Sequence, residues 1–108
     1  MSSNADAVKA LEQAKRSLKT QLESISDQER ADRLHDAIER ISDEVSAVEA
    51  KNLAISTYVP CTDSFQKATK DGKAFIAELK NLQNIFSTVE AVARAIDQVL
   101  KLVGKLGL

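Results

Sequence analysis

The residues with the widest chemical range lie in one short stretch, STYVPCTDSF, which contains the only proline, cysteine and tyrosine of the 108-residue chain. A thiol near a helix N-terminus can have a lowered pKa and act as a nucleophile, but it needs a base beside it. The only histidine, His35, precedes Cys61 by 26 positions. If the chain reverses near Pro60, these two side chains lie more than about 30 Å apart, at 1.5 Å of helix per residue. We therefore expect no catalytic Cys–His couple and interpret Cys61 as a loop residue.

Acidic side chains around His35 are the second set that could do chemistry. Asp32 and His35 have the acid-x-x-His spacing that helical bundles use in two copies to hold two metal ions. The chain has a single histidine and no second copy of this motif. A solvated acidic stripe explains these side chains more simply, and its members are Asp32, Asp36, Glu39 and Asp43. We expect neither a metal nor another cofactor, and we do not expect an enzyme.

The charge of the chain argues against nucleic acid as a partner. Its net charge is -1 and its pI is about 5.8, whereas nucleic-acid binding usually needs clustered Lys and Arg. A short basic patch of Lys67, Lys70 and Lys73 could contact phosphates or an anionic membrane, but Asp63 and Asp71 dilute it. The patch is interpreted as a solvated helix face.

The sequence carries no mark of export or of a membrane span. Its N-terminus lacks the basic start and apolar run of a signal peptide, and no apolar run reaches the length of about 18 residues that a transmembrane helix needs. The single cysteine cannot form an internal disulfide, which favours a reducing compartment. We expect a soluble, cytoplasmic protein, with export without a cleavable signal left open.

The elements that position these residues are predicted to be helices. Hydrophobic residues make up 44% of the chain, which has only three Gly and one Pro, a composition rich in helix formers. Apolar residues from Asp6 to Val59 recur at helical spacing, in two registers that are out of phase. The slip falls at SISDQER, where Ser26 and Glu29 have the spacing of a capping box. We expect a helix break there, with one long helix over residues 5–57 as the alternative.

The second half of the chain carries one uninterrupted apolar seam. From Phe65 to Val103, apolar residues alternate at intervals of three and four. This pattern predicts a single helix of about 40 residues, roughly 60 Å long. If the chain reverses near Pro60, residues 34–57 face residues 65–86, and Ile55 lies opposite Phe65.

The predicted fold is therefore all-α, with residues 1–108 in a single domain. We expect an antiparallel helical hairpin or bundle of three helices with a coiled-coil-like heptad seam. Two very long helices, or four helices, are the alternatives.

The C-terminal segment VEAVARAIDQVLKLVGKLGL carries an apolar stripe that is wider than a two-helix seam needs. Its neighbours could be two helices of its own chain, a second copy, another helical protein or a lipid surface. The predicted interaction residues are Val92, Ile96, Val99, Leu100 and Val103.

We predict a non-enzymatic protein–protein association module, structural, adaptor or chaperone-like, that forms a homo-oligomer, most simply a dimer. The alternative is a membrane-active helical protein that uses its C-terminal amphipathic stripe.

Overall fold

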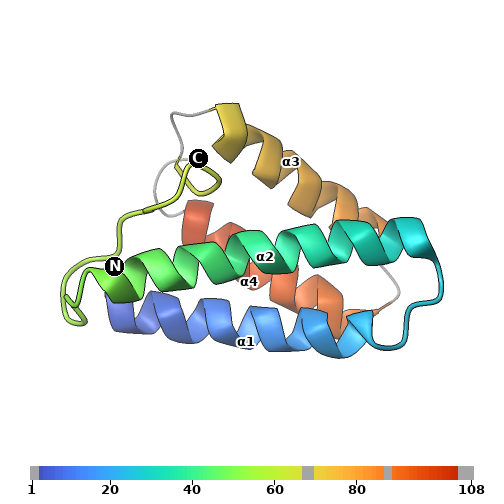
Figure 1. The fold of residues 1–108 in the computed structure, drawn as a ribbon, viewed down its shortest axis with the longest axis horizontal. Helices are drawn as coiled ribbons and strands as arrows, with labels where there is room; N and C mark the ends of the chain where they lie inside the picture. Colours follow the sequence, from blue (N-terminus) through green and yellow to red (C-terminus); the bar gives the residue numbers. More distant parts are fainter. Residues whose placement is uncertain (1–2, 67–69, 87–88, 105–108) are drawn as a thin grey trace.

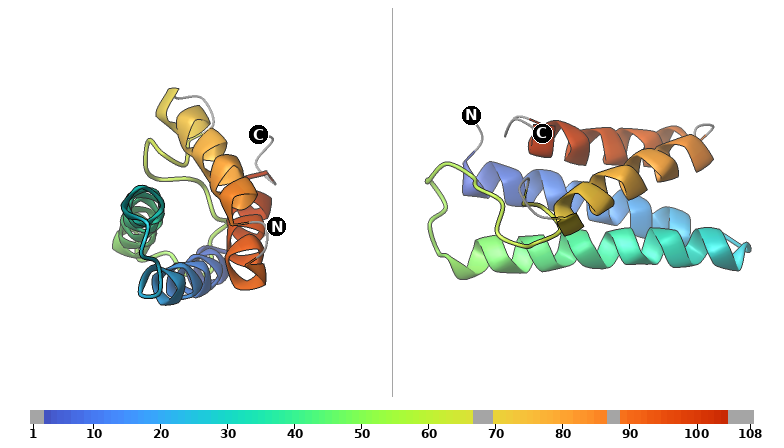
Figure 2. Two further views of the ribbon diagram at one scale, coloured as in Figure 1. Left: turned by 90° about the vertical axis from the view of Figure 1, so that its right-hand side faces the viewer. Right: turned by 90° about the horizontal axis from the view of Figure 1, so that it is seen from above.

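The computed structural model describes residues 3–66, 70–86 and 89–104, and this part of the chain contains four α-helices. Their bounds are α1 Asn4–Leu22, α2 Gln28–Ala50, α3 Lys70–Ile85 and α4 Glu90–Gly104. Helices α1 and α2 lie antiparallel and side by side, and α4 lies along the other side of α1 (Figures 1 and 2). Helix α3 contacts α2 and α4 and diverges from α2 toward its own N-terminal end (Figure 1). The all-helical fold class is confirmed, with four helices where we expected three.

The helix break predicted near Ser26 is present, because α1 ends at Leu22 and α2 begins at Gln28. The residue that caps α2 is Asp27, one position after the predicted serine. Its Oδ1 accepts hydrogen bonds from the backbone N–H groups of Glu29 and Arg30, at 3.0 and 3.3 Å. A carboxylate at this position satisfies first-turn donors and complements the helix dipole. The alternative of one helix over residues 5–57 is wrong.

The predicted 40-residue helix is also wrong, because α3 ends at Ile85 and α4 begins at Glu90. The chain turns after Phe86, and the N–H of Val89 donates to the Phe86 carbonyl at 2.9 Å. Both helices bury apolar residues in the same core, but the buried positions step by six from Phe86 to Val92, and Val89 and Ala93 of the predicted seam are only partly buried. The predicted heptad seam is therefore not matched.

The reversal between α2 and α3 is longer than the sequence predicted. Helix α2 ends at Ala50, and Asn52 follows it with a φ of 53°, in the left-handed region that Asn tolerates better than most residues. Ile55 was expected opposite Phe65 in a helical seam. It is instead 94% exposed while Phe65 is buried. The predicted pairing fails there because residues 51–57 are not helical.

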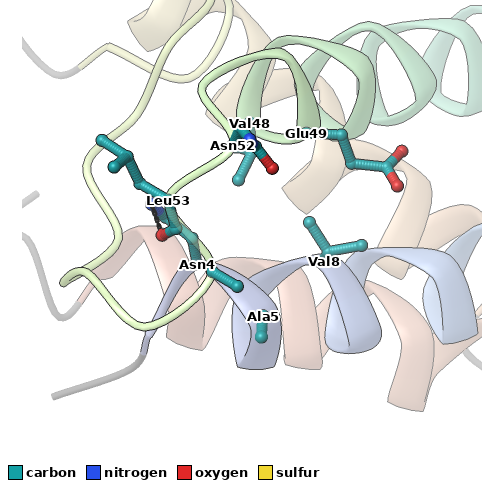
Figure 3. A pocket seen from close by; sticks show the side chains of 8 residues that line it. Asn4, Ala5, Val8, Val48, Glu49, Asn52 and Leu53 are labelled. Carbon is teal, nitrogen blue, oxygen red and sulfur yellow. Dashed lines mark hydrogen bonds between the residues drawn. The ribbon is translucent and has the colours of Figure 1, made fainter.

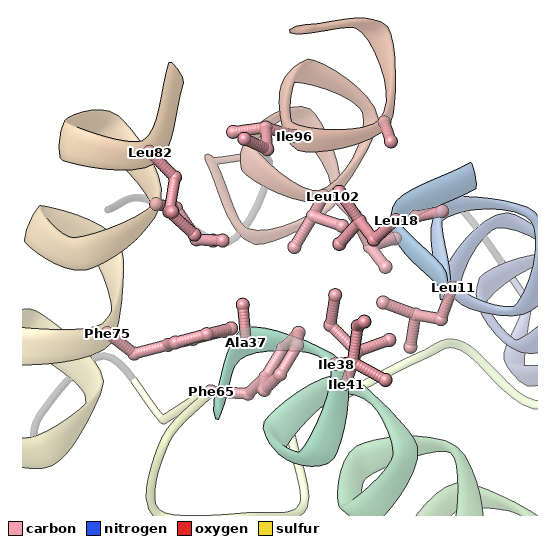
Figure 4. Packing of buried hydrophobic residues seen from close by; sticks show 14 of the residues in the cluster. Leu11, Leu18, Ala37, Ile38, Ile41, Phe65, Phe75, Leu82, Ile96 and Leu102 are labelled. Carbon is pink, nitrogen blue, oxygen red and sulfur yellow. The ribbon is translucent and has the colours of Figure 1, made fainter. Parts of the chain in front are cut away.

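One apolar core joins all four helices and the α2–α3 connection. Tyr58 and Phe65 enter it from that connection, and the Phe65 and Phe75 rings are 5.1 Å apart between centroids (Figure 4). Full burial of each large apolar side chain contributes about 1.5 to 3 kcal/mol. The largest fully buried apolar residues are Leu11, Leu18, Leu34, Ile41, Val48, Phe65, Phe75, Leu79, Leu82, Val92 and Ile96.

Candidate functional site

The STYVPCTDSF stretch is held in place by a buried carboxylate, Glu44 of α2, whose exposure is 0%. Its Oε2 accepts from the Tyr58 hydroxyl at 2.7 Å and from the Cys61 N–H at 3.0 Å. Its Oε1 accepts from the N–H and the hydroxyl of Thr62, both at 2.8 Å. Buried charge is tolerated when strong hydrogen bonds replace its hydration. We call Glu44, Tyr58, Cys61 and Thr62 the Glu44 latch.

The latch engages the polar groups of this stretch in hydrogen bonds within the chain. Burial, followed by the hydrogen bond and the negative charge of Glu44, raises the pKa of Tyr58 well above its ordinary value. Cys61 contributes its backbone N–H to the latch, while its thiol donates to the Val59 carbonyl at 3.3 Å. These groups therefore fix the path of the chain after α2.

The other sequence-predicted chemical residues lie apart from this latch. His35 faces Glu39 one turn along α2, with Nδ1 and Oε1 3.6 Å apart and both side chains exposed. Nowhere among the described residues do three His, Cys, Asp or Glu side chains lie where they could hold a metal ion. Of the predicted basic patch, Lys67 and the side chains of Lys70 and Lys73 fall outside the described part of the chain.

One acidic residue of the predicted stripe belongs to a charged cluster between α2 and α3. Arg40 Nε lies 3.1 Å from Asp36 Oδ2 and 3.8 Å from Glu78 Oε2, and the guanidinium also donates to Ser64 Oγ at 3.0 Å. Burial, and then the hydrogen bond to Asp36 and its negative charge, raise the pKa of Glu78 to about 7. The same hydrogen bond, with the charge of Arg40, lowers the pKa of Asp36. Glu78 is therefore the member of this pair that takes up a proton as the pH falls below about 7, and its carboxyl can then donate to Asp36.

The start of α1 fixes the first part of the α2–α3 connection. The N–H groups of Asn4 and Ala5 donate to the carbonyls of Ser56 and Ala54 at 2.8 and 3.0 Å. The Asn4 side-chain amide donates to the Leu53 carbonyl at 2.8 Å (Figure 3). These bonds use N–H groups that a helix start leaves without partners, and the chain's own carbonyls satisfy them.

Because the backbone of this connection turns toward α1, several of its apolar side chains face outward. Leu53 and Val59 are 54% and 55% exposed, and Ile55 is 94% exposed. These are the three large apolar residues with high exposure in the described chain. We call residues 51–60 the tip loop, and it lies at the end of the bundle where α1 begins (Figure 1). Its backbone is ordered by hydrogen bonds while its apolar side chains meet solvent.

A hollow of about 320 Å³ lies beside the tip loop, between the start of α1 and the end of α2. Figure 3 shows Val8 and Val48 on the two helices that form its walls. We call it the tip hollow, and its lining residues are Asn4, Ala5, Val8, Val48, Glu49, Asn52, Leu53 and Ala54. Apolar groups beside a few polar ones are typical of binding sites.

The interaction residues predicted on the C-terminal stripe do not belong to the tip loop or the tip hollow. Val92, Ile96 and Val99 are buried in the core of the chain itself, and Leu100 is partly buried against it. The side chain of Val103 lies outside the described part. Helix α4 contacts α1 and α3, so its wide stripe has two neighbours within one chain. A partner could reach the three buried residues only if α4 moved away.

Sequence reasoning missed both Glu44 and the tip loop. A signal for Glu44 existed, because it lies three residues after Ile41 and four before Val48, on the same buried face of α2. A carboxylate at such a position must find hydrogen-bond donors. For the tip loop there was no comparable signal, because Ile55 lies seven residues after Val48 and so continues the helical spacing of α2.

Comparison with known proteins gives no further guide to function: no family model, no curated protein and no solved structure matches the chain. None of the helices, as far as their residues are described, has the length and apolar character needed to cross a membrane.

Proposed function

We propose that this protein is a non-enzymatic protein-association module and that the tip loop is its contact surface. The observation that carries the proposal is Ile55, which is 94% exposed on a loop whose backbone is hydrogen-bonded to α1. Burying one such side chain at an interface contributes about 1.5 to 3 kcal/mol. Since the loop is already ordered, little conformational entropy is lost when a partner covers it.

The environment of the chemically rich residues supports a binding role over a catalytic one. The hydroxyls of Tyr58 and Thr62 both donate to the carboxylate of Glu44 in the latch. These bonds hold the end of the tip loop and the residues that follow it, while Leu53, Ile55 and Val59 of the loop remain exposed. The alternative, a membrane-active protein that uses the C-terminal stripe, gains no support because that stripe packs against α1 and α3.

The proposal is tested by photocrosslinking in the cells that make the protein. Ile55 is replaced by benzoylphenylalanine, and Ala77, an exposed residue of α3, is replaced in the same way as the matched control. We expect a discrete protein adduct from position 55 and none of comparable yield from position 77. If position 55 gives no protein adduct, or if the two positions give the same adducts, the tip loop is not a protein-association surface.

A further inference from the structure

We propose that the partner of the tip loop is a second copy of this chain, with Ile55 of each copy inserted in the tip hollow of the other. This inference rests on the proposed function and adds the identity of the partner. It follows from three features of one surface: an apolar protrusion, an apolar hollow beside it, and two charges of opposite sign at its edge.

The protrusion and the hollow complement each other in shape. Ile55 follows directly on Leu53 and Ala54, which line the tip hollow. In a two-fold dimer the same patch meets itself, so each protrusion faces the hollow of the other copy. The hollow, at about 320 Å³, lies at the lower end of the range of binding sites, about 300 to 1,000 Å³. It therefore suits a side chain with its flanking backbone.

The aliphatic side chain of Ile55 also matches the tip hollow in chemistry. Five of the eight lining residues are apolar, and of these Val8 is partly exposed and Leu53 is 54% exposed, so the hollow favours an aliphatic group. No hydrogen bond in the described part of the chain is donated by the backbone N–H of Ile55. Asn52, an exposed residue at the edge of the hollow, offers a side-chain acceptor for that N–H in the second copy. An apolar centre with a polar edge is the usual anatomy of a protein interface.

The charges at the edge favour a second copy over an anionic ligand or membrane. Glu49 lines the tip hollow and Lys51 follows two residues later, both exposed and neither in an ion pair with another described residue. A two-fold dimer can set Glu49 of one copy against Lys51 of the other, twice. The N–H groups of Asn4 and Ala5 are already bound to loop carbonyls, so the start of α1 offers them to no anion. Glu49 would also repel an anionic lipid surface.

The oligomeric state tests the inference. Sedimentation equilibrium is run on the purified wild-type chain, on Ile55→Asp and on Ala77→Asp, an exposed control on α3. We expect a dimer whose Kd rises about 100-fold or more in Ile55→Asp, because the side chain is buried twice in a two-fold dimer. Ala77→Asp should leave the Kd within about threefold. Since Ile55 is exposed in the single chain, helical circular dichroism should be the same for all three proteins.

Charge reversal provides a second, independent readout. Lys51→Glu should weaken the dimer, because it places two acidic residues against each other. Adding Glu49→Lys to that variant restores the opposite signs and should recover most of the lost affinity. Recovery requires that the two positions meet across the interface.

Failure of this inference differs from failure of the proposed function. A monomeric wild type across micromolar to hundred-micromolar concentration, or a dimer that Ile55→Asp leaves intact, overturns tip-to-tip self-association. In the photocrosslinking experiment, an adduct formed from position 55 with twice the mass of the chain supports the second copy as the partner. A protein adduct from position 55 with any other mass overturns the identification of the partner as a second copy, while the proposed association function stands.

Discussion

At the scale of single residues, Glu44 determines what the most chemically suggestive stretch can do. One carboxylate accepts hydrogen bonds from Tyr58, Cys61 and Thr62 and so holds this stretch against α2. Its cost of burial is offset by four donors, and removing the carboxylate takes away the acceptor of each, including the buried Tyr58 hydroxyl. Substitution of Glu44 should therefore lower the free energy of unfolding, because the α2–α3 connection loses the hydrogen bonds that hold it to α2.

We expect Glu44→Gln to lower the free energy of unfolding by about 2 to 4 kcal/mol. An amide has a donor in place of one of the two accepting oxygens, so at least one of the four donors from Tyr58, Cys61 and Thr62 loses its acceptor. Urea denaturation measures the change. The matched control is Asp43→Asn, the exposed neighbour, which should stay within about 0.5 kcal/mol of wild type. A cost equal to that of the control would mean that the latch does not stabilise the fold.

Tyr58 offers a direct optical test of the latch, because it is the only tyrosine and the chain has no tryptophan. Its raised pKa means that the folded protein keeps the phenolic proton above pH 10, the ordinary pKa, while the unfolded chain releases it. Stability should therefore fall as pH rises above about 10. Tyrosinate absorbance at 295 nm should appear together with unfolding, not before it. A tyrosinate signal near pH 10 in a protein that is still helical would contradict the burial of this hydroxyl.

At the scale of elements, the sequence predicted helices well and predicted their ends poorly. The change of register near Ser26 revealed the α1–α2 break because each helix turns a different set of residues to the core. The α3–α4 break left no such mark, because Phe86, Val89 and Ala93 continue the alternation of three and four. The buried face of α4 begins instead at Val92. Helix α2 ends early because α1 takes the carbonyls of Ala54 and Ser56, a contact between segments about 50 residues apart.

The junction of α2 and α3 should respond to pH through Glu78. Its pKa of about 7 lies above the ordinary value of 4.5, so the folded state binds this proton more tightly than the unfolded state. The resulting stability is complete below about pH 4.5 and is lost as pH rises through about 7. The lowered pKa of Asp36 acts in the opposite sense, and its contribution is lost only as the solution becomes strongly acidic.

We expect Glu78→Gln to remove this loss, because the amide can donate to Asp36 at every pH. Urea denaturation from pH 5 to pH 9 should give a falling stability for wild type and a flatter profile for the variant, which should be the more stable protein at pH 9. The control Asp43→Asn should keep the wild-type slope. Equal slopes in all three proteins would show that Glu78 does not donate a proton to Asp36.

At the scale of the whole molecule, the four helices of residues 3–66, 70–86 and 89–104 close one core, and the large apolar side chains with high exposure among these residues belong to the tip loop. The wide apolar stripe of α4 suggested an interface because the sequence does not show how many helices of the same chain pack against it. Helices α1 and α3 take up most of that stripe. Spacing cannot distinguish an apolar residue that faces a core from one that faces solvent, and Ile55 is the clearest example. The candidate site therefore became visible only in three dimensions.

The central claim, that the tip loop is an association surface filled by a second copy, is tested most directly by isotope-filtered NMR on a mixed dimer. One copy carries labelled isoleucine methyl groups and the other labelled valine methyl groups, and only contacts between copies are recorded. We predict intermolecular contacts from the Ile55 methyl groups to those of Val8, the partly exposed valine that lines the tip hollow. Intermolecular contacts from Ile96 to Val92 or Val99, with none from Ile55, would place the interface on α4 and contradict the claim.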